Sequence, residues 1–527
     1  MARLTTFSKL LLTLLIVGAV AFGIYTFQNS DAGKKLIDDS KELVEDAGSN
    51  NGTSTSNSGT NSSNGDPNTI KIGVVTWGGY AGGQYYNEGF KANTQSRFYK
   101  DYGFKVEFKI LDDFEQSRNA FKSGGVDLLW ATIDAFPTEV EALRKYEPQV
   151  VFQADWSRGG DAIVSRRGIN KVSDLRGKRV AVAELTPSHS FLLWLLDAGG
   201  LTINDITLVS QASAIDAAAA FKSGQVDAAV VWSPDDEDCV KSVAGSRILE
   251  SSKSASHIIA DVFIAKKAYV EANEQKLRQL YEGWMKGAAE INANAGNKKK
   301  AAKILADAFD GFDESMTLNA INNVRLCTHG DNQNFFGLNS SYKNMTGEAL
   351  YNKMTNVYRG IGAIKANAQI PNWRLIRYSG LVSGTQLTGA SHTGEGQKTF
   401  AAIKESDKSK ASFASKQVSI TFRTGEFQLD ENAKYIIDKD FVEIAKAFGN
   451  ARIRIEGNTD NVGSRSSNVS LSKKRAQSVA SYLINEHGMP RNRIIVIGNG
   501  PDKPVASNDT ADGKAKNRRT DFELIPD

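Results

Sequence analysis

Residues 454–484 read RIEGNTDNVGSRSSNVSLSKKRAQSVASYLI, and this stretch decides the fold of the C-terminal part of the chain. Residues 452–456 alternate polar and apolar side chains, which predicts a half-buried strand that ends at Gly457. The polar run over residues 458–467 predicts a loop. From Leu471 onward, apolar residues recur at the spacing of a helix. The pattern therefore predicts a strand, a loop and a helix in that order.

Two charged residues flank this loop. Asp460 lies at the end of the strand and Arg475 lies on the helix fifteen residues later, so the loop can bring the two side chains face to face. Such a pair suits a zwitterionic ligand, because a carboxylate binds an ammonium group and a guanidinium binds a carboxylate through two parallel hydrogen bonds. The alternative is an internal ion pair between Asp460 and Arg475 that binds no ligand.

Residues 417–527 resemble the OmpA-like peptidoglycan-binding domain, a small α+β domain. The elements that carry the resemblance are, in order, Gly457-Asn458-Thr459-Asp460, Gly463, Asn468, Leu471-Ser472, Arg475-Ala476 and Asn517-Arg518-Arg519. The resemblance implies that the ligand is the diaminopimelate side chain of the peptidoglycan stem peptide. It implies Asp460 and Arg475 as principal contacts, with support from Thr459, Asn468 and Arg518. Asn458 replaces the family's usual histidine, and we expect this position to be structural.

The N-terminal sequence predicts export. Arg3 and Lys9 precede an uncharged stretch whose apolar portion, residues 10–27, is just long enough to span a bilayer, since a spanning helix needs about 20 residues. The preceding positive charges predict a cytoplasmic N-terminus and a periplasmic body anchored in the inner membrane. The alternative is a cleaved signal peptide, because Ala19-Val20-Ala21 fits a small-residue cleavage site. Apolar sequence continues past this site, which favours the uncleaved helix. No cysteine directly follows the apolar stretch, so we expect no lipid anchor.

The composition predicts several domains. A chain of 527 residues is too long for one hydrophobic core, and a net charge of +4 is near neutral for this size, which argues against nucleic-acid binding. Two stretches rich in Gly, Ser and Thr predict linkers, because they contain too few apolar residues to order. The expected organisation is an anchor or signal sequence (1–30), a linker (31–69), a large domain (70–383), a second linker (384–416) and the wall-binding domain (417–527).

The sequence gives no sign of catalysis. It contains no metal-binding motif, nucleophile elbow or phosphate-cradling glycine loop, so we expect no enzyme, no catalytic residue, no metal and no cofactor. Cys239 and Cys327 are the two cysteines of the chain. They can form one disulfide in an oxidising periplasm, and two separate buried thiols fit the sequence as well.

An internal repeat marks the large domain. Residues 121–130 read FKSGGVDLLW, and residues 221–232 read FKSGQVDAAVVW. Each copy predicts the end of a helix, a glycine that stops it, an aspartate and a short buried strand. The wide separation of the copies predicts an α/β domain of two similar lobes rather than a solenoid, with the second lobe over residues 166–260.

This domain resembles the type II periplasmic solute-binding proteins, near the nitrate, sulfonate, taurine and pyrimidine-precursor binders. The resemblance covers residues 70–294 and is carried by the strand and loop at 72–80, by the two S-G-x-V-D turns, and by VSDLRGKRVAV at 172–182. It implies capture of a small molecule between two lobes and its delivery to an ABC transporter permease or a membrane sensor.

The carboxyl ends of the strands predict the solute site, because ligands of open α/β sheets bind there. The start of an apolar helix at 186–190 offers N–H and hydroxyl groups to an oxyanion such as phosphate, nitrate or sulfonate, although Ser188 can equally cap the helix. Tryptophans at strand ends suit a planar or quaternary ammonium ligand, or simply close the core. The candidate residues are Trp77, Gly78, Gly79, Tyr80, Trp130, Thr132, Asp134, Thr186, Ser188, His189, Ser190, Trp232 and Asp235.

The charge of the solute stays open at this point, and three functions fit the sequence. The first is a wall-tethered solute-binding protein, the second a structural spacer whose solute-binding fold contacts a protein partner, and the third an envelope sensor. An intact cleft with a polar lining favours the first and third. A cleft filled by residues 295–382 favours the spacer.

Overall fold

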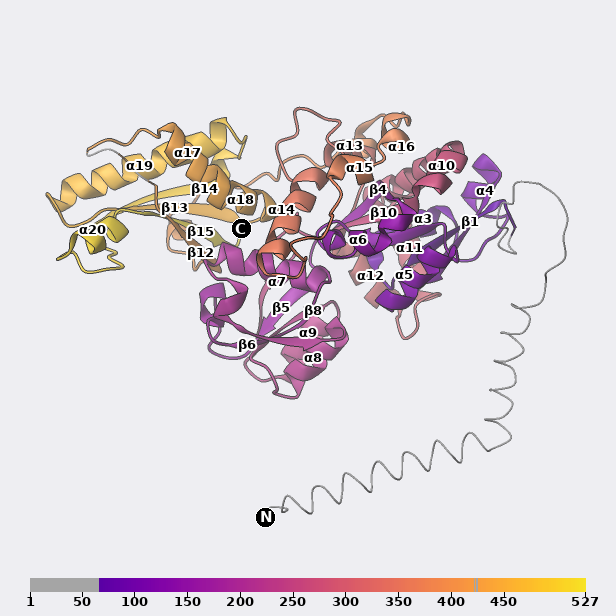
Figure 1. Ribbon diagram of the computed structural model, residues 1–527, viewed down its shortest axis with the longest axis horizontal. Helices are drawn as coiled ribbons and strands as arrows, with labels where there is room; N and C mark the ends of the chain where they lie inside the picture. The colour runs from indigo at the N-terminus through magenta and orange to yellow at the C-terminus, as the bar shows by residue number, and fades with distance from the viewer. Residues whose placement is uncertain (1–65, 421, 423–424) are drawn as a thin grey trace, which may run out of the picture. The chain divides into compact units, whose positions relative to one another are not determined.

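A computed structural model describes residues 66–420, 422 and 425–527 (Figure 1). The expected N-terminal anchor and most of the first linker lie outside these residues. Among the helices that the structure describes, none has both the length and the apolar character needed to cross a membrane.

The first lobe of the large domain is built on a six-stranded sheet with the order β11-β4-β10-β3-β1-β2. Its strands are β1 Thr69–Val74, β2 Lys105–Ile110, β3 Leu128–Thr132, β4 Pro148–Ser157, β10 Ala260–Lys266 and β11 Val324–Leu326. β1 runs parallel to β2 and β3, whereas β10 runs antiparallel to β3 and β4. Its helices include α3 Ala81–Tyr86, α4 Arg97–Tyr102, α5 Phe114–Ser123 and α10 Lys267–Ala293.

The second lobe contains a five-stranded sheet with the order β7-β6-β8-β5-β9. Its strands are β5 Asp161–Ser165, β6 Arg179–Ala183, β7 Thr207–Gln211, β8 Ala228–Trp232 and β9 Arg247–Ser251, and its helices are α7 Pro187–Ala198, α8 Ala214–Lys222 and α9 Asp235–Ser242. The chain crosses between the lobes twice, from β4 to β5 and from β9 to β10. The two-lobed α/β architecture expected from the repeat is therefore present.

Both copies of the repeat form the same local structure. Gly124 and Gly224 follow α5 and α8 in the left-handed conformation, with φ of 82° and 85°, which glycine adopts without strain. Asp127 and Asp227 come next, and each carboxylate accepts a backbone N–H from the neighbouring strand at 2.8 Å. The repeated aspartate thus fixes β3 against β1 and β8 against β6.

The chain after β10 completes the first lobe and then leads to the C-terminal domain. It forms α11 Ala295–Ala306, α12 Glu314–Asn322, α13 His329–Phe335, α14 Gly347–Gly360, α15 Trp373–Ile376 and α16 Gly380–Ser383. Cys239 and Cys327 are separate buried thiols, so the disulfide alternative does not occur.

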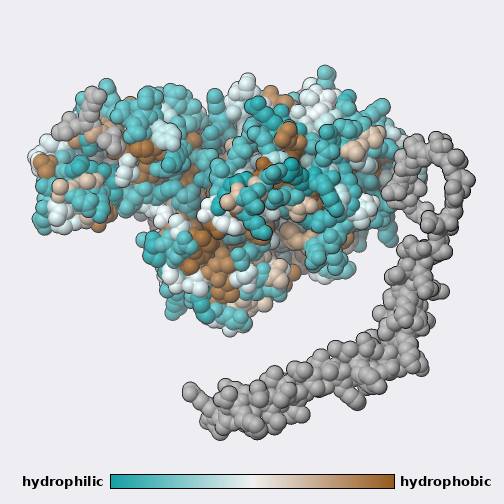
Figure 2. Space-filling view, viewed as in Figure 1, coloured by the Kyte–Doolittle hydropathy of each residue, from teal (hydrophilic) through white to brown (hydrophobic). Residues whose placement is uncertain are grey.

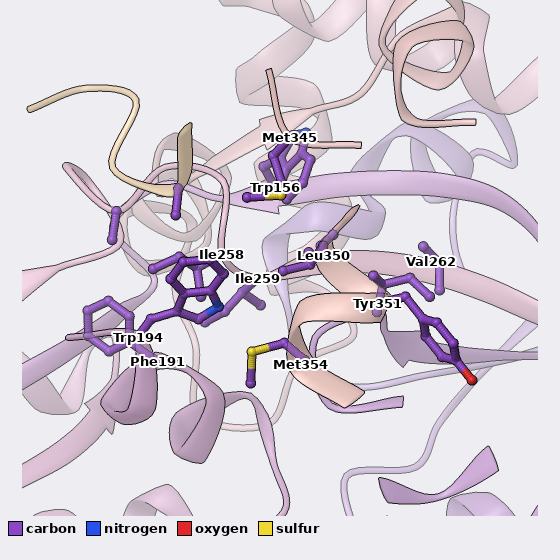
Figure 3. Packing of buried hydrophobic residues seen from close by; sticks show 14 of the residues in the cluster. Trp156, Phe191, Trp194, Ile258, Ile259, Val262, Met345, Leu350, Tyr351 and Met354 are labelled. Carbon is purple, nitrogen blue, oxygen red and sulfur yellow. The ribbon is translucent and has the colours of Figure 1, made fainter. Parts of the chain in front are cut away.

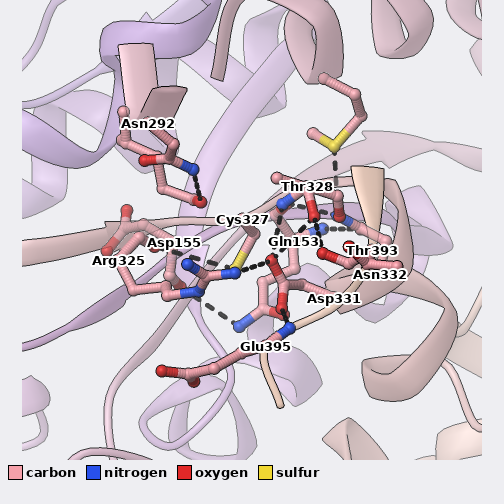
Figure 4. A network of polar contacts seen from close by, with 12 residues as sticks. Gln153, Asp155, Asn292, Arg325, Cys327, Thr328, Asp331, Asn332, Thr393 and Glu395 are labelled. Atoms are coloured by element: carbon pink, nitrogen blue, oxygen red, sulfur yellow. Dashed lines mark hydrogen bonds and ion pairs between the residues drawn. The ribbon is translucent and has the colours of Figure 1, made fainter. Parts of the chain in front are cut away.

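Residues 384–416, expected to be a linker, contain two short 3-10 helices, η6 Ala390–His392 and η7 Glu405–Lys408. The segment nevertheless makes specific contacts with the large domain, as Figure 4 shows for Thr393 and Glu395. Thr328 Oγ1 donates to the carbonyl of Thr393 at 3.1 Å, and Glu395 forms an ion pair with Arg158 at 2.6 Å. In the structure this connection is packed along part of its length.

The C-terminal domain is a four-stranded sheet, β12-β15-β13-β14, with helices packed on it (Figure 1). Its strands are β12 Ala414–Val418, β13 Arg452–Asn458, β14 Ile494–Gly500 and β15 Thr520–Ile525, and its helices are α17 Glu431–Ile437, α18 Glu443–Ala447, α19 Arg465–Asn485 and α20 Ala511–Asn517. α19 packs along β13 and β14.

Two boundaries in this domain differ from the prediction. β13 continues past Gly457 to Asn458, because Gly457 serves close packing rather than strand termination: a Cβ atom there would lie 2.2 Å from the carbonyl oxygen of Ser472 on α19. α19 begins at Arg465, inside the predicted loop, because the Ser464 side chain caps it by accepting the N–H of Ser467.

Candidate functional sites

The loop between β13 and α19 holds the predicted wall-binding carboxylate. Asp460 is half-buried, and its carboxylate accepts the N–H of Val462 at 3.1 Å and the Nη1 of Arg518 at 2.7 Å. Burial alone raises the pKa of Asp460, but the bonds from Arg518 and Val462 and the charges of Arg518 and Lys514 outweigh it and lower the pKa below its usual value. Asp460 is therefore ionised at neutral pH.

Arg475 lies on α19 close to this carboxylate. Its Nε donates to the carbonyl of Glu426 at 3.0 Å, and its guanidinium lies 4.8 Å from the centre of the Phe422 ring. Burial lowers the pKa of Arg475, the charge of Arg518 lowers it further, and the Asp460 carboxylate raises it. Two guanidinium groups and one carboxylate thus act on one another, and the excess positive charge suits a ligand carboxylate.

Thr459 and Asn468, predicted as supporting contacts, hold the loop that carries Asp460. The backbone N–H of Thr459 donates to Gly500 O at 2.8 Å, and Asn468 Nδ2 donates to Val462 O at 3.0 Å. Both bonds fix the loop against the rest of the domain. The structure therefore gives these residues a positioning role as well.

Asn458, which stands where the resembled family has histidine, is buried and bonded on both sides. Its Nδ2 donates to Asp521 at 2.9 Å, and its Oδ1 accepts from Asn499 at 3.0 Å. These contacts agree with a structural position.

The predicted solute residues that follow β1 face two aspartates that the sequence analysis did not identify. Trp77 Nε1 donates to Asp155 Oδ1 at 3.4 Å, and Tyr80 Oη donates to Asp261 Oδ1 at 2.6 Å. A Cβ atom at Gly79 would lie 1.7 Å from Asp155 Oδ2, so glycine there leaves room for the carboxylate. Gly78 also packs closely, since a Cβ atom there would lie 2.5 Å from the backbone of Ala320. The two glycines therefore allow this turn to pack closely against its neighbours.

The predicted solute residues in and after β3 lie deeper. Asp134 is fully buried, with Oδ1 accepting the N–H of Ala260 at 3.4 Å. Burial raises the pKa of Asp134 well above its usual range, and a hydrogen bond from Ser190 of the second lobe opposes that shift. Thr132 is the cross-strand neighbour of Asp261. Trp130 is buried beneath Arg118, whose guanidinium lies 4.5 Å from its ring, so Trp130 belongs to the core of the lobe.

The start of α7, predicted to bind an oxyanion, uses its side chains within the protein. Thr186 Oγ1 donates to Ala183 O at 2.7 Å, Ser188 Oγ accepts from Trp232 Nε1 at 3.0 Å, and Ser190 Oγ lies 2.8 Å from Tyr358 Oη. His189 Nδ1 accepts the N–H of Leu185 at 3.2 Å. Burial lowers the pKa of His189 to about 4, so its ring is neutral at neutral pH.

The second lobe adds one more carboxylate to the junction. Asp161 accepts a hydrogen bond from Ser157 at 2.7 Å, and it lies opposite Trp232 on the neighbouring strand. Burial raises the pKa of Asp161 to about 7. Asp235, predicted at the same place, has its charge interactions with Lys222 and Asp238 instead.

The sequence signal for the missed aspartates was a charged residue inside an apolar strand. Asp155 interrupts PQVVFQADWS in β4, and Asp261 interrupts ADVFIAK in β10. Both are buried, and neither follows a strand end in the way that the other candidates do.

The described part of the chain contains no group of three or more His, Cys, Asp or Glu side chains that could hold a metal ion.

α14, which carries Tyr358, packs between the two lobes. Figure 3 shows Leu350 and Met354 of α14 against Trp194 of α7 and against Ile258 and Ile259 of the second crossing. This apolar cluster ties the lobes together beside the polar junction. In the space-filling view of Figure 2, apolar atoms gather on the second lobe near α7. A groove of about 470 Å³ lies there, lined by Leu193, Leu196, Leu201, Ile203, Val357 and Ile361 among others.

Comparison with known proteins divides the chain in the same way. Residues 421–518 match the family model described as OmpA family, and residues 88–296 match the one described as NMT1/THI5 like. The chain therefore carries an OmpA-type domain at its C-terminus and an NMT1/THI5-like domain before it.

The similarity to individual proteins is partial. Outer membrane porin F of Pseudomonas aeruginosa is 35% identical over 108 residues, which cover 20% of this chain and 31% of that protein. Peptidoglycan-binding protein ArfA of Mycobacterium tuberculosis is 43% identical over 90 residues, which cover 17% of this chain and 27% of that protein. The chain thus spans less than a third of either relative. The periplasmic aliphatic sulphonate binding protein SsuA from Escherichia coli aligns with a TM-score of 0.47 and 19% identity, over 60% of this chain and 100% of that one.

Proposed function

We propose that this protein binds peptidoglycan through the loop after β13 and holds a two-lobed solute-binding domain beside the cell wall. The observation that carries the proposal is the group of Asp460, Arg475 and Arg518. One carboxylate and two guanidinium groups lie together at this loop. The carboxylate can bind the ammonium group of a diaminopimelate side chain, and the guanidinium groups can bind its carboxylate. The match of residues 421–518 to the OmpA family supports this assignment.

A pull-down with purified peptidoglycan sacculi tests the wall-binding site. Asp460→Asn removes one charge while keeping the shape of the side chain, and Arg475→Ala removes the guanidinium. We expect either variant to lose at least tenfold in retention, because charge-assisted bonds contribute about 1.5–3 kcal/mol each. Asp512→Ala is the control, since that exposed carboxylate pairs with Lys516 at 2.8 Å, and we expect this variant to be retained normally. Normal retention of both site variants would show that the assigned site is wrong.

In this proposal the large domain captures a small molecule between its lobes and passes it to an inner-membrane ABC permease or sensor. The predicted apolar stretch at residues 10–27 would keep the domain near that membrane, and the wall-binding domain would hold its other end. Support comes from the buried polar junction of the lobes, where Asp134 of the first lobe interacts with Ser190 of the second, and Ser157 of the first lobe donates to Asp161 of the second at 2.7 Å. No catalytic step forms part of the proposal.

A second function, a spacer between membrane and wall, is favoured by one observation. α14 lies in the segment 295–382, and its Tyr358 is fully buried against Ser190 and His189 of the second lobe. A helix fixed in this way restricts opening of the lobes. A thermal-shift screen of the full-length chain separates the two functions: a solute that raises the melting temperature supports capture, and no response to any solute supports the spacer.

A further inference from the structure

Two buried carboxylates face each other at the junction of the lobes. Asp155 of β4 and Asp261 of β10 are direct partners in an antiparallel ladder, and their exposed fractions are 0% and 4%. Opposite residues in such a ladder have Cβ atoms about 4.5–5.5 Å apart, and like charges at these positions are destabilising. Burial increases the cost, because neither charge is solvated by bulk water. The protein thus keeps two carboxyl groups in a place where folding alone disfavours their ionised forms.

The neighbouring side chains satisfy only part of this pair. Tyr80 donates to Asp261 and Trp77 donates to Asp155, but Asp155 Oδ2 has no hydrogen-bond partner among the described residues. Asp134 Oδ2, fully buried beside them, is also without a partner in the described part of the chain. Buried carboxylate oxygens are normally hydrogen-bonded or ion-paired, so two unpartnered ones at one junction suit a hydrogen-bond donor that the described residues do not supply.

Two neighbouring arginines form ion pairs with other carboxylates. Arg118 acts on the pKa of Tyr80, but its guanidinium makes two bonds to Glu139, at 2.6 and 2.8 Å. Arg325, on the strand next to Asp155, pairs with Asp331 at 3.0 Å (Figure 4). Among the described residues, the groups that shift the pKa values of Asp155 and Asp261 include other aspartates and no cation.

We propose that the solute held between the lobes is an organic cation whose ammonium or guanidinium group binds Asp155 and Asp261. This inference rests on the proposed solute-binding function and names the chemistry of its ligand. Asp134 and Asp161 lie within electrostatic reach of Asp261, so a molecule with a second nitrogen could use them as well. The half-buried Trp77 lies against Asp155 and offers its ring to a cation. The same side chains would repel an oxyanion, and the hydroxyls of α7 are already engaged.

A thermal-shift assay on the full-length chain at pH 8 tests the inference. The cation probes are choline, putrescine, spermidine, agmatine and L-arginine at 10 mM, and the anion probes are sodium phosphate, nitrate and ethanesulfonate, with sodium chloride as the ionic-strength control. The variants are Asp155→Asn and Asp261→Asn, which keep shape and remove charge. Glu250→Gln is the matched control, because Glu250 is a buried carboxyl with a pKa also raised to about 7 by burial.

We expect at least one cation to raise the melting temperature of the wild type and of Glu250→Gln by several degrees. Both aspartate variants should fold and lose that shift, with at least a tenfold weaker dissociation constant by titration. A shift with an anion alone would overturn the cation assignment and leave solute capture standing. A cation shift that both aspartate variants retain would also overturn it. A flat response to every probe would overturn both the assignment and the proposed capture.

Discussion

Single buried residues set the electrostatics of the lobe junction, and Asp261 shows the consequence for stability. Burial, together with the charge of Asp161 and against the hydrogen bond from Tyr80, raises its pKa in the folded protein to about 7, whereas an unfolded aspartate titrates at about 3.9. The folded ligand-free protein therefore binds more protons than the unfolded chain between these values. Its stability falls as the pH rises from about 4 to about 7, and is regained on acidification.

Asp261→Asn should remove this part of the pH dependence. The groups that face Asp261 are Asp155, Asp134, Asp161 and Tyr80, so the variant also relieves repulsion within the cluster. We expect the variant to be more stable than wild type at pH 8 and nearly equal to it at pH 4, in urea unfolding without ligand. A difference between the two proteins that is the same at both pH values would contradict the assignment of the raised pKa to this carboxyl.

Gly79 belongs to the same scale, because its missing side chain makes the site possible. In Gly79→Ala the new Cβ would lie 1.7 Å from Asp155 Oδ2 and 2.7 Å from Trp77 Nε1, so the turn or the carboxylate must move. We expect a loss of about 1–3 kcal/mol in the free energy of unfolding. Gly125→Ala is the matched control, since the nearest atom there is 3.4 Å away. Equal melting temperatures for the two variants would show that the turn yields freely.

At the scale of elements, the start of α19 decides how the loop with Asp460 is held. Ser464 caps the helix by accepting the N–H of Ser467, at 3.2 Å. Ser464→Ala should lower the free energy of unfolding of the C-terminal domain by about 0.5–2 kcal/mol, because one N–H at the helix terminus loses its partner. Ser481→Ala, within the same helix, should be neutral or slightly stabilising. Denaturant unfolding followed by circular dichroism measures both, and equal losses would refute the capping role.

The same helix shows how far sequence patterns reach. The alternation of residues 452–456 and the glycines after α5 and α8 predicted strands and helix ends, because those signals are local. The first turn of α19 is polar, so apolar spacing placed the helix start at Leu471 rather than Arg465. The carboxylates of Asp155 and Asp261 could not be paired from sequence, because strand order and register bring them together. Residues 77–80 were among the predicted solute residues. Their hydrogen bonds to Asp155 and Asp261 could not be predicted, because these contacts join segments far apart in the chain.

At the scale of the whole large domain, the two crossings between the lobes meet the segment that leads to the wall-binding domain. Arg158 lies in the first crossing and His257 in the second, and both contact Glu395 of that segment, at 2.6 and 3.6 Å. Burial alone raises the pKa of Glu395, but its bonds to His257 and Arg158 outweigh burial and lower it well below the usual range. Its contribution to stability is therefore present above the unfolded pKa and is lost as the pH falls through the folded pKa.

Glu395→Gln should consequently loosen the crossings. It leaves Arg158 partly buried without its carboxylate, and breaking such a pair costs about 3–5 kcal/mol when fully buried and less here, where Glu395 is about one-third exposed. We expect a lower melting temperature and faster proteolytic cleavage within residues 384–416 at pH 7. Glu405→Gln is the control in the same segment, because its pair with Lys408 is largely exposed. If the two variants are cleaved at the same rate, Glu395 does not hold the crossings. Faster cleavage of Glu395→Gln alone would show that Glu395 holds the connection at residues 384–416 against both crossings.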